Sequence, residues 1–145
     1  MKVGIFGQFY HANSGSYIEE LLEVLDSENI EVVIEEEFLK LIHQNNSIHK
    51  EYCHFNTFEE LDGTYDFFFS VGGDGTILKS VDYVRDLNIP IVGINTGRLG
   101  FLATVNKEEL KATISHLIKK EFSISERSLL SVETEPQNRD LIIHN

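Results

Sequence analysis

A single aspartate surrounded by glycines is the part of this sequence best suited to chemistry. Asp74 lies in the run Gly72-Gly73-Asp74-Gly75-Thr76. The three glycines allow positive φ and let a ligand approach the backbone, while the amides at the start of a helix attract anions. The same amides should keep the Asp74 carboxylate ionised. It could then accept a hydrogen bond from a hydroxyl, take its proton or help to hold a divalent cation. We therefore expect a sugar or alcohol hydroxyl beside a phosphate donor.

A purely structural interpretation of this run stays open. The glycines could form only a tight turn in which Asp74 caps the following helix. Two standard phosphate-binding fingerprints are absent. No Gly-x-x-x-x-Gly-Lys-Ser/Thr sequence occurs, and the stretch from Gly73 to Leu78 departs from Gly-x-Gly-x-x-Gly at its last position. Neither a P-loop nor an ordinary Rossmann dinucleotide turn is predicted.

The residues on either side of the run predict a buried strand followed by a helix. Residues 67–71 are almost all apolar, too few for a helix and rich in β-forming types, which is typical of a central strand in a parallel sheet. After the glycines the apolar residues recur with helical spacing. The expected buried face of this helix consists of Ile77, Leu78, Val81, Val84 and Leu87.

A second glycine-rich loop follows the next predicted strand. Residues 91–94 form another apolar run, and the loop after it extends from Asn95 to Gly100. Six of the ten glycines lie between residues 72 and 100. In open α/β sheets, ligands bind beyond the carboxyl ends of the strands, so we expect both loops to line one crevice. The alternative is a turn in which Phe101 fills the core.

The remaining periodicity predicts the fold. Strands are expected over residues 2–6, 30–34, 122–126, 129–133 and 141–143, and helices around residues 18–25, 39–43 and 107–118. Ser14 or Ser16 would cap the first helix, and Asn106 with Glu109 would form a capping box. We predict an α/β fold with an open, mostly parallel, Rossmann-like sheet and helices on both faces over residues 1–125. Residues 126–145 would begin a β-rich second domain that is incomplete.

Composition limits the classes of partner. With 145 residues, 41% of them hydrophobic, the chain can bury one core, and it lacks an apolar run long enough for a membrane span or a signal peptide. We expect a cytoplasmic protein, which the single cysteine, Cys53, fits. The net charge of −12 argues against nucleic-acid and membrane binding. An anionic ligand would depend on backbone amides, on Lys79 and Arg98, and on a metal that the ligand itself carries.

Two other clusters of polar residues are not expected to form sites. Glu35, Glu36 and Glu37 are interpreted as a solvated face or strand end. His49, Cys53 and His54 lack the paired spacing of a zinc site, so we predict surface structure there and no metal site.

The two glycine-rich loops together resemble the NAD kinase family. Gly72-Gly73-Asp74-Gly75-Thr76 alone is shared with diacylglycerol and sphingosine kinases and distantly with phosphofructokinases. The run from Gly93 to Leu102, Gly-Ile-Asn-Thr-Gly-Arg-Leu-Gly-Phe-Leu, is the part that looks specific to NAD kinases. Residues 126–130, Glu-Arg-Ser-Leu-Leu, also resemble the family's entry into its second domain.

The resemblance implies transfer of the γ-phosphoryl group of ATP, or of polyphosphate, to the 2′-hydroxyl of the adenosine ribose of NAD, which gives NADP. Asp74 would be the proton acceptor. Mg²⁺ or another divalent cation would arrive with ATP. The dimers or tetramers common in the family imply a homo-oligomer. The implied binding residues are Gly72, Gly73, Asp74, Gly75, Thr76, Lys79, Asn95, Gly100 and Phe101, with Gly100 and Phe101 forming a wall of the adenine pocket.

The family's pattern continues beyond Asn145 into a full β-rich domain with an Asn-Glu pair that grips NAD. The chain therefore looks like an N-terminal fragment, and we expect little or no kinase activity from it alone. Two other functions stay open. One is a lipid kinase of the diacylglycerol or sphingosine type, which would need a membrane-facing surface. The other is a sensor that binds NAD or NADP without chemistry.

Overall fold

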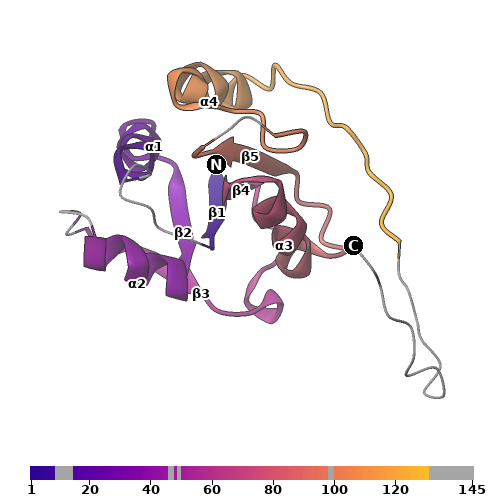
Figure 1. Ribbon diagram of the computed structural model, residues 1–145, viewed down its shortest axis with the longest axis horizontal. Coiled ribbons are helices and arrows are strands. Elements are labelled where there is room, and N and C mark those ends of the chain that lie inside the picture. Colours follow the sequence, from indigo (N-terminus) through magenta and orange to yellow (C-terminus); the bar gives the residue numbers. More distant parts are fainter. Residues whose placement is uncertain (9–14, 46–47, 49, 98–99, 131–145) are drawn as a thin grey trace.

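The computed structural model describes residues 1–8, 15–45, 48, 50–97 and 100–130. Within these residues, five parallel strands form one sheet in the order β3-β2-β1-β4-β5 (Figure 1). This is the order of the first five strands of a Rossmann-type sheet. The predicted α/β class and Rossmann-like sheet are therefore confirmed. The strands are β1 (Lys2–Gly7), β2 (Glu31–Glu35), β3 (Cys53–Phe55), β4 (Phe67–Gly72) and β5 (Ile91–Asn95).

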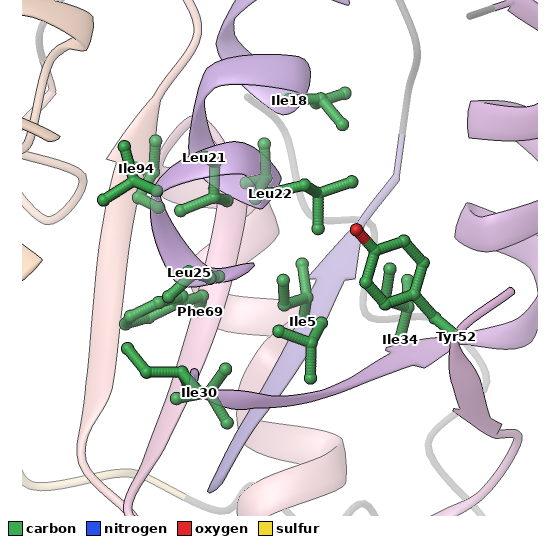
Figure 2. Packing of buried hydrophobic residues seen from close by; sticks show 14 of the residues in the cluster. Ile5, Ile18, Leu21, Leu22, Leu25, Ile30, Ile34, Tyr52, Phe69 and Ile94 are labelled. Carbon is green, nitrogen blue, oxygen red and sulfur yellow. The ribbon is translucent and has the colours of Figure 1, made fainter. Parts of the chain in front are cut away.

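Helices cover both faces of the sheet, as predicted. They are α1 (Gly15–Ser27), α2 (Glu36–Asn45), α3 (Asp74–Val84) and α4 (Leu110–Ile118), with short 3₁₀ helices η1 (Phe58–Glu60) and η2 (Lys107–Glu109). One apolar cluster joins α1, α2 and α4 to one face of the strands. Figure 2 shows its centre, where Leu21 and Leu25 of α1 lie over Ile5, Phe69 and other strand residues.

An aromatic cluster fills the other face beneath α3. Phe6, Phe55 and Phe68 come from three different strands, and each ring lies near the ring of Tyr83 on α3. The centroid of the Tyr83 ring is 5.0 Å from that of Phe6 and 6.1 Å from that of Phe68, with the latter pair stacked. Such ring pairs add to the stabilisation that burial alone provides. This second cluster, which includes Val84 and Tyr83 of α3, holds the helix on the sheet.

The buried face of α3 differs from the predicted one. Thr76, Ser80 and Val84 are its buried residues, while Leu78 is 59% exposed. The prediction followed the apolar residues, but α3 packs against β4 and β5 with small side chains in its first two turns. Small residues let a helix lie close to a sheet, so the larger Leu78 is on the outward side.

The region around residues 35–55 also departs from expectation. Glu35 is the last residue of β2, which agrees with the strand end that was one of its two interpretations, but it is not part of a solvated face. It is 7% exposed, because its carboxylate accepts a hydrogen bond from the Phe38 amide at 2.8 Å and caps α2. The short edge strand β3 was not predicted. Its first two residues, Cys53 and His54, are exposed, so the chain there lacks the alternating pattern that marks a half-buried strand. His49 lies outside the described residues.

The capping box that Asn106 forms with Glu109 is confirmed at η2. Ser14 lies outside the described residues, and Ser16 lies within the first turn of α1. Within the described residues no helix is both long and apolar enough to cross a membrane.

The segment after α4 does not form the predicted strand. Residues 121–130 are exposed and without regular secondary structure, so the expected strand over residues 122–126 is absent there. An extended segment becomes a strand only when another strand pairs with it. In Figure 1 this segment runs away from the helices as a single extended trace. The strands expected beyond residue 130 lie outside the described residues, and the domain boundary near residue 125 stays a prediction.

Two leucines on different helices test this account of the core. Leu21→Ala on α1 should lower the free energy of unfolding by about 2–5 kcal/mol, because its side chain is 1% exposed and its loss leaves a cavity. Leu78→Ala on α3, as a matched control, should change it by less than about 1 kcal/mol. Urea denaturation of both variants measures the difference. Equal destabilisation would contradict the assigned orientation of α3.

Candidate active site

The two glycine-rich loops emerge side by side from the sheet. Strands β4 and β5 are parallel neighbours, and Gly72 at the end of β4 lies opposite Asn95 at the end of β5. The loop after β4 turns at once into α3, and the loop after β5 begins at Thr96. The predicted convergence of the loops at one edge of the sheet follows from this register.

The turn between β4 and α3 requires glycine at one position. Gly72 has a φ of 153°, and a Cβ there would overlap the Oγ1 atom of Thr76. Gly73 has a φ of −103° and is the N-cap of α3, and Gly75 lies in the first turn with no positive φ. Of the three glycines, Gly72 is thus the one that uses the positive φ that glycine allows. A Cβ on either would meet no atom within 4 Å, so their open backbone is accessible to a ligand.

Asp74, the first residue of α3, is hydrogen-bonded to the second loop. Its Oδ2 atom accepts the amide of Phe101 at 2.9 Å, and its Oδ1 atom accepts the amides of Leu102 at 2.9 Å and Ala103 at 3.0 Å. The backbone amides of Ala103, Leu102 and Phe101 lower the pKa of the Asp74 carboxyl below its ordinary value. The predicted ionised state agrees with this, and the second loop supplies hydrogen bonds that the prediction did not include.

Asn95 is buried, and its side chain orders the second loop. It is 3% exposed, its Oδ1 atom accepts the Gly97 amide at 2.7 Å, and its Nδ2 atom donates to the Ala103 carbonyl at 3.2 Å. The loop then returns along β5, where the Asn95 amide donates to the Val105 carbonyl at 2.7 Å. Gly93 permits this return, since a Cβ there would lie 2.8 Å from the Ala103 Cα. The placement favours a structural role for Asn95, whereas the sequence suggested ligand contact.

Two residues near Asp74 have large, exposed apolar side chains: Phe101, whose amide donates to Oδ2 of Asp74, and Leu78 on α3. Phe101 is 95% exposed, so the alternative in which it fills the core is wrong. Leu78 lies four residues after Asp74, which places both on one side of α3. Sequence analysis missed Leu78 because an apolar residue at helical spacing is usually buried.

Two other predicted residues are placed differently. Thr76 is buried under the first turn of α3, and its carbonyl accepts the Ser80 hydroxyl at 2.9 Å. Lys79 lines a hollow of about 330 Å³ between β1, α2 and α3, together with Glu35, Asp82 and other residues, and Asp74 does not border it. The structure therefore does not bring Lys79 to the Asp74 carboxylate. Arg98 lies outside the described residues.

The low pKa of Asp74 makes its contribution to stability depend on pH. Asp74→Asn should destabilise the chain at pH 7, and the difference should shrink as pH falls. The pKa of this carboxyl is lower in the folded chain than in the unfolded chain, where it is about 3.9. The ionised group therefore stabilises the folded state in full above the unfolded-state pKa, and this stabilisation is lost as pH falls through the folded-state pKa. Urea unfolding between pH 7 and pH 3 tests this, with exposed Asp86→Asn as the control. A difference that stays constant with pH would contradict the hydrogen-bonded carboxylate.

Comparisons with known proteins identify the family. Residues 3–122 match the model of the ATP-NAD kinase N-terminal domain. The NAD kinase of Christiangramia forsetii is 63% identical over 97% of this chain and 48% of its own length, and that of Flavobacterium psychrophilum is 44% identical over 92% and 45%. The chain thus spans about half the length of the curated relatives it matches. A crystal structure of yeast NADH kinase complexed with NADH shares the fold, with a TM-score of 0.64 and 20% identity over 81% of this chain and 38% of that one. The chain belongs to the NAD kinase family.

Proposed function

We propose that the protein carrying this chain transfers the γ-phosphoryl group of ATP, or a phosphoryl group of polyphosphate, to the 2′-hydroxyl of the adenosine ribose of NAD. The product would be NADP. The observation that carries the proposal is the partly exposed Asp74 carboxylate, which is hydrogen-bonded at the meeting point of the family's two glycine-rich loops. Family membership supports NAD as the acceptor and ATP as the donor.

The geometry suits phosphoryl transfer to a hydroxyl. In-line transfer depends mainly on positioning and on neutralising charge, with little covalent chemistry for the protein to do. Asp74 would accept the hydrogen bond of the ribose hydroxyl and direct its oxygen at the phosphorus. Because the pKa of this carboxyl is lowered, it is a weak base. Its main contribution would be orientation of the hydroxyl, with the proton leaving late in the transfer.

We propose that the divalent cation arrives on the phosphates of ATP. Among the described residues, no three His, Cys, Asp or Glu side chains come together in a way that could hold a metal ion. A cation carried by ATP needs no such cluster, because phosphate oxygens and water supply most of the ligands of Mg²⁺ in kinases. It would neutralise the charge that develops on the transferred group.

We also propose a homo-oligomer in the cytoplasm. The apolar side chains of Leu129 and Leu130 are 65% and 95% exposed, which is the kind of surface that a second domain or another subunit covers. Analytical ultracentrifugation of a protein in which this chain is joined to a second domain would test the assembly. A purely monomeric species at micromolar concentration would contradict it.

The reaction can be tested in a chimera that joins this chain to the half of the Christiangramia forsetii NAD kinase that it does not match. With ATP, Mg²⁺ and NAD, the chimera should form NADP, while the 145-residue chain alone should form little or none. Asp74→Asn should lower kcat by about 10²–10⁴-fold, through loss of the group that orients the hydroxyl and accepts its proton. It should weaken NAD binding by no more than about tenfold, the value of the one hydrogen bond that the NH₂ group of Asn cannot accept. Asp86→Asn should have no effect. Chromatographic measurement of NADP gives the rates.

The unmodified relative, assayed in parallel, shows that the conditions are adequate. Absence of NADP from a folded chimera would contradict the proposed function. NAD binding without product would then favour a sensor, and phosphorylation of added diacylglycerol would favour a lipid kinase.

A further inference from the structure

The two oxygens of the Asp74 carboxylate are used unequally. Oδ1 accepts hydrogen bonds from the amides of Leu102 and Ala103. Among the described residues, Oδ2 accepts one hydrogen bond, from the amide of Phe101. An ionised carboxylate oxygen has room for about two hydrogen bonds. Oδ1 is therefore filled by the loop, and Oδ2 can accept one further donor.

We propose that these three backbone N–H groups, the amide cradle of Phe101, Leu102 and Ala103, are a positioning device that presents Oδ2 of Asp74 to the acceptor hydroxyl. The inference rests on the proposed function and adds to it which oxygen of Asp74 accepts the hydrogen bond of the substrate hydroxyl. Asp74 stays the group that touches the substrate. The cradle acts through it by fixing the plane of the carboxylate, since rotation about the side chain would break all three hydrogen bonds.

The cradle can do this because it is attached to the sheet. Ala103 is completely buried, and its carbonyl accepts the Asn95 Nδ2 at 3.2 Å and the Gly100 amide at 3.4 Å. The Val105 amide donates to the Gly93 carbonyl of β5 at 3.1 Å. The amide that reaches Oδ1 from Ala103 therefore comes from backbone held on both sides, and not from a freely moving loop.

Gly100 is the residue that lets the carboxylate enter the cradle. A Cβ at this position would overlap Oδ1 of Asp74 and would lie 2.7 Å from its Cγ and 2.9 Å from its Oδ2. A Cβ at Gly97, in the same loop, would approach nothing nearer than the Asn95 Oδ1 at 4.0 Å. Gly100→Ala should therefore displace the carboxylate, and Gly97→Ala provides a matched control for adding a methyl group to this loop.

Amide hydrogen exchange tests the cradle on the 145-residue chain without any substrate. In Asp74→Asn, the side-chain oxygen can keep the two bonds at the Oδ1 position, but its NH₂ group cannot accept the Phe101 amide. Exchange at Phe101 should accelerate about tenfold, as loss of one such bond implies, while Leu102 and Ala103 change little. Gly100→Ala should accelerate all three, and Gly97→Ala none. Equal acceleration of the three amides in Asp74→Asn, or none in Gly100→Ala, would overturn the proposal.

Ligand affinity in the chimera tests the role of Oδ2 separately from turnover. NAD should bind about tenfold more tightly than its 2′-deoxy analogue, the value of one hydrogen bond to a charged group. This preference should persist in Gly97→Ala and disappear in Gly100→Ala. A preference that survives in Gly100→Ala would overturn the proposal. If the exchange pattern holds but NAD does not bind, the proposed function fails, and the proposed presentation of Oδ2 to its hydroxyl fails with it.

Discussion

The hydrogen bonds between Asp74 and the loop after β5 are the interaction on which the site depends. They join the first residue of α3 to residues 101–103, which lie about thirty positions later in the chain. Three glycines are needed for this junction to form. Gly72 allows the turn into α3, Gly93 allows the loop to return along the sheet, and Gly100 leaves space for the carboxylate. The glycine-rich character of both loops is therefore a steric consequence of bringing a carboxylate and a backbone so close together.

The same junction bears on how an acidic chain would bind the anionic substrate that we propose for it. With a net charge of −12, the molecule as a whole repels phosphates at a distance. Recognition would then depend on short-range features at the carboxyl ends of β4 and β5. These are the open backbone at Gly73 and Gly75 and the exposed apolar side chains of Leu78 and Phe101. A carboxylate that is already satisfied by three amides adds less repulsion than a bare one, because its charge is spread over fixed dipoles.

Much of the fold and part of the site could be predicted from sequence, because the parallel strands are continuous apolar runs and Asp74 follows one of them directly. The capping box at Asn106 was equally visible, since both partners lie within four residues. The errors have physical causes. Leu78 was assigned to the core because periodicity records polarity and not the size of the helix–sheet gap. The burial of Glu35 at the end of its strand was not predicted, because a cap to the next helix depends on where that helix begins. The hydrogen bond from Ala103 to Asp74 could not be predicted from residue type, because a backbone amide donates it.

The most direct measurement is the titration of the Asp74 side-chain carboxyl carbon by NMR in the folded 145-residue chain, with Asp74→Asn used to assign the signal. The central claim is that the second loop holds this carboxylate in its ionised form. The account predicts a pKa below the ordinary aspartate value of about 3.9. A pKa at or above that value would show that the amides of residues 101–103 do not hold the carboxylate, and would contradict the account.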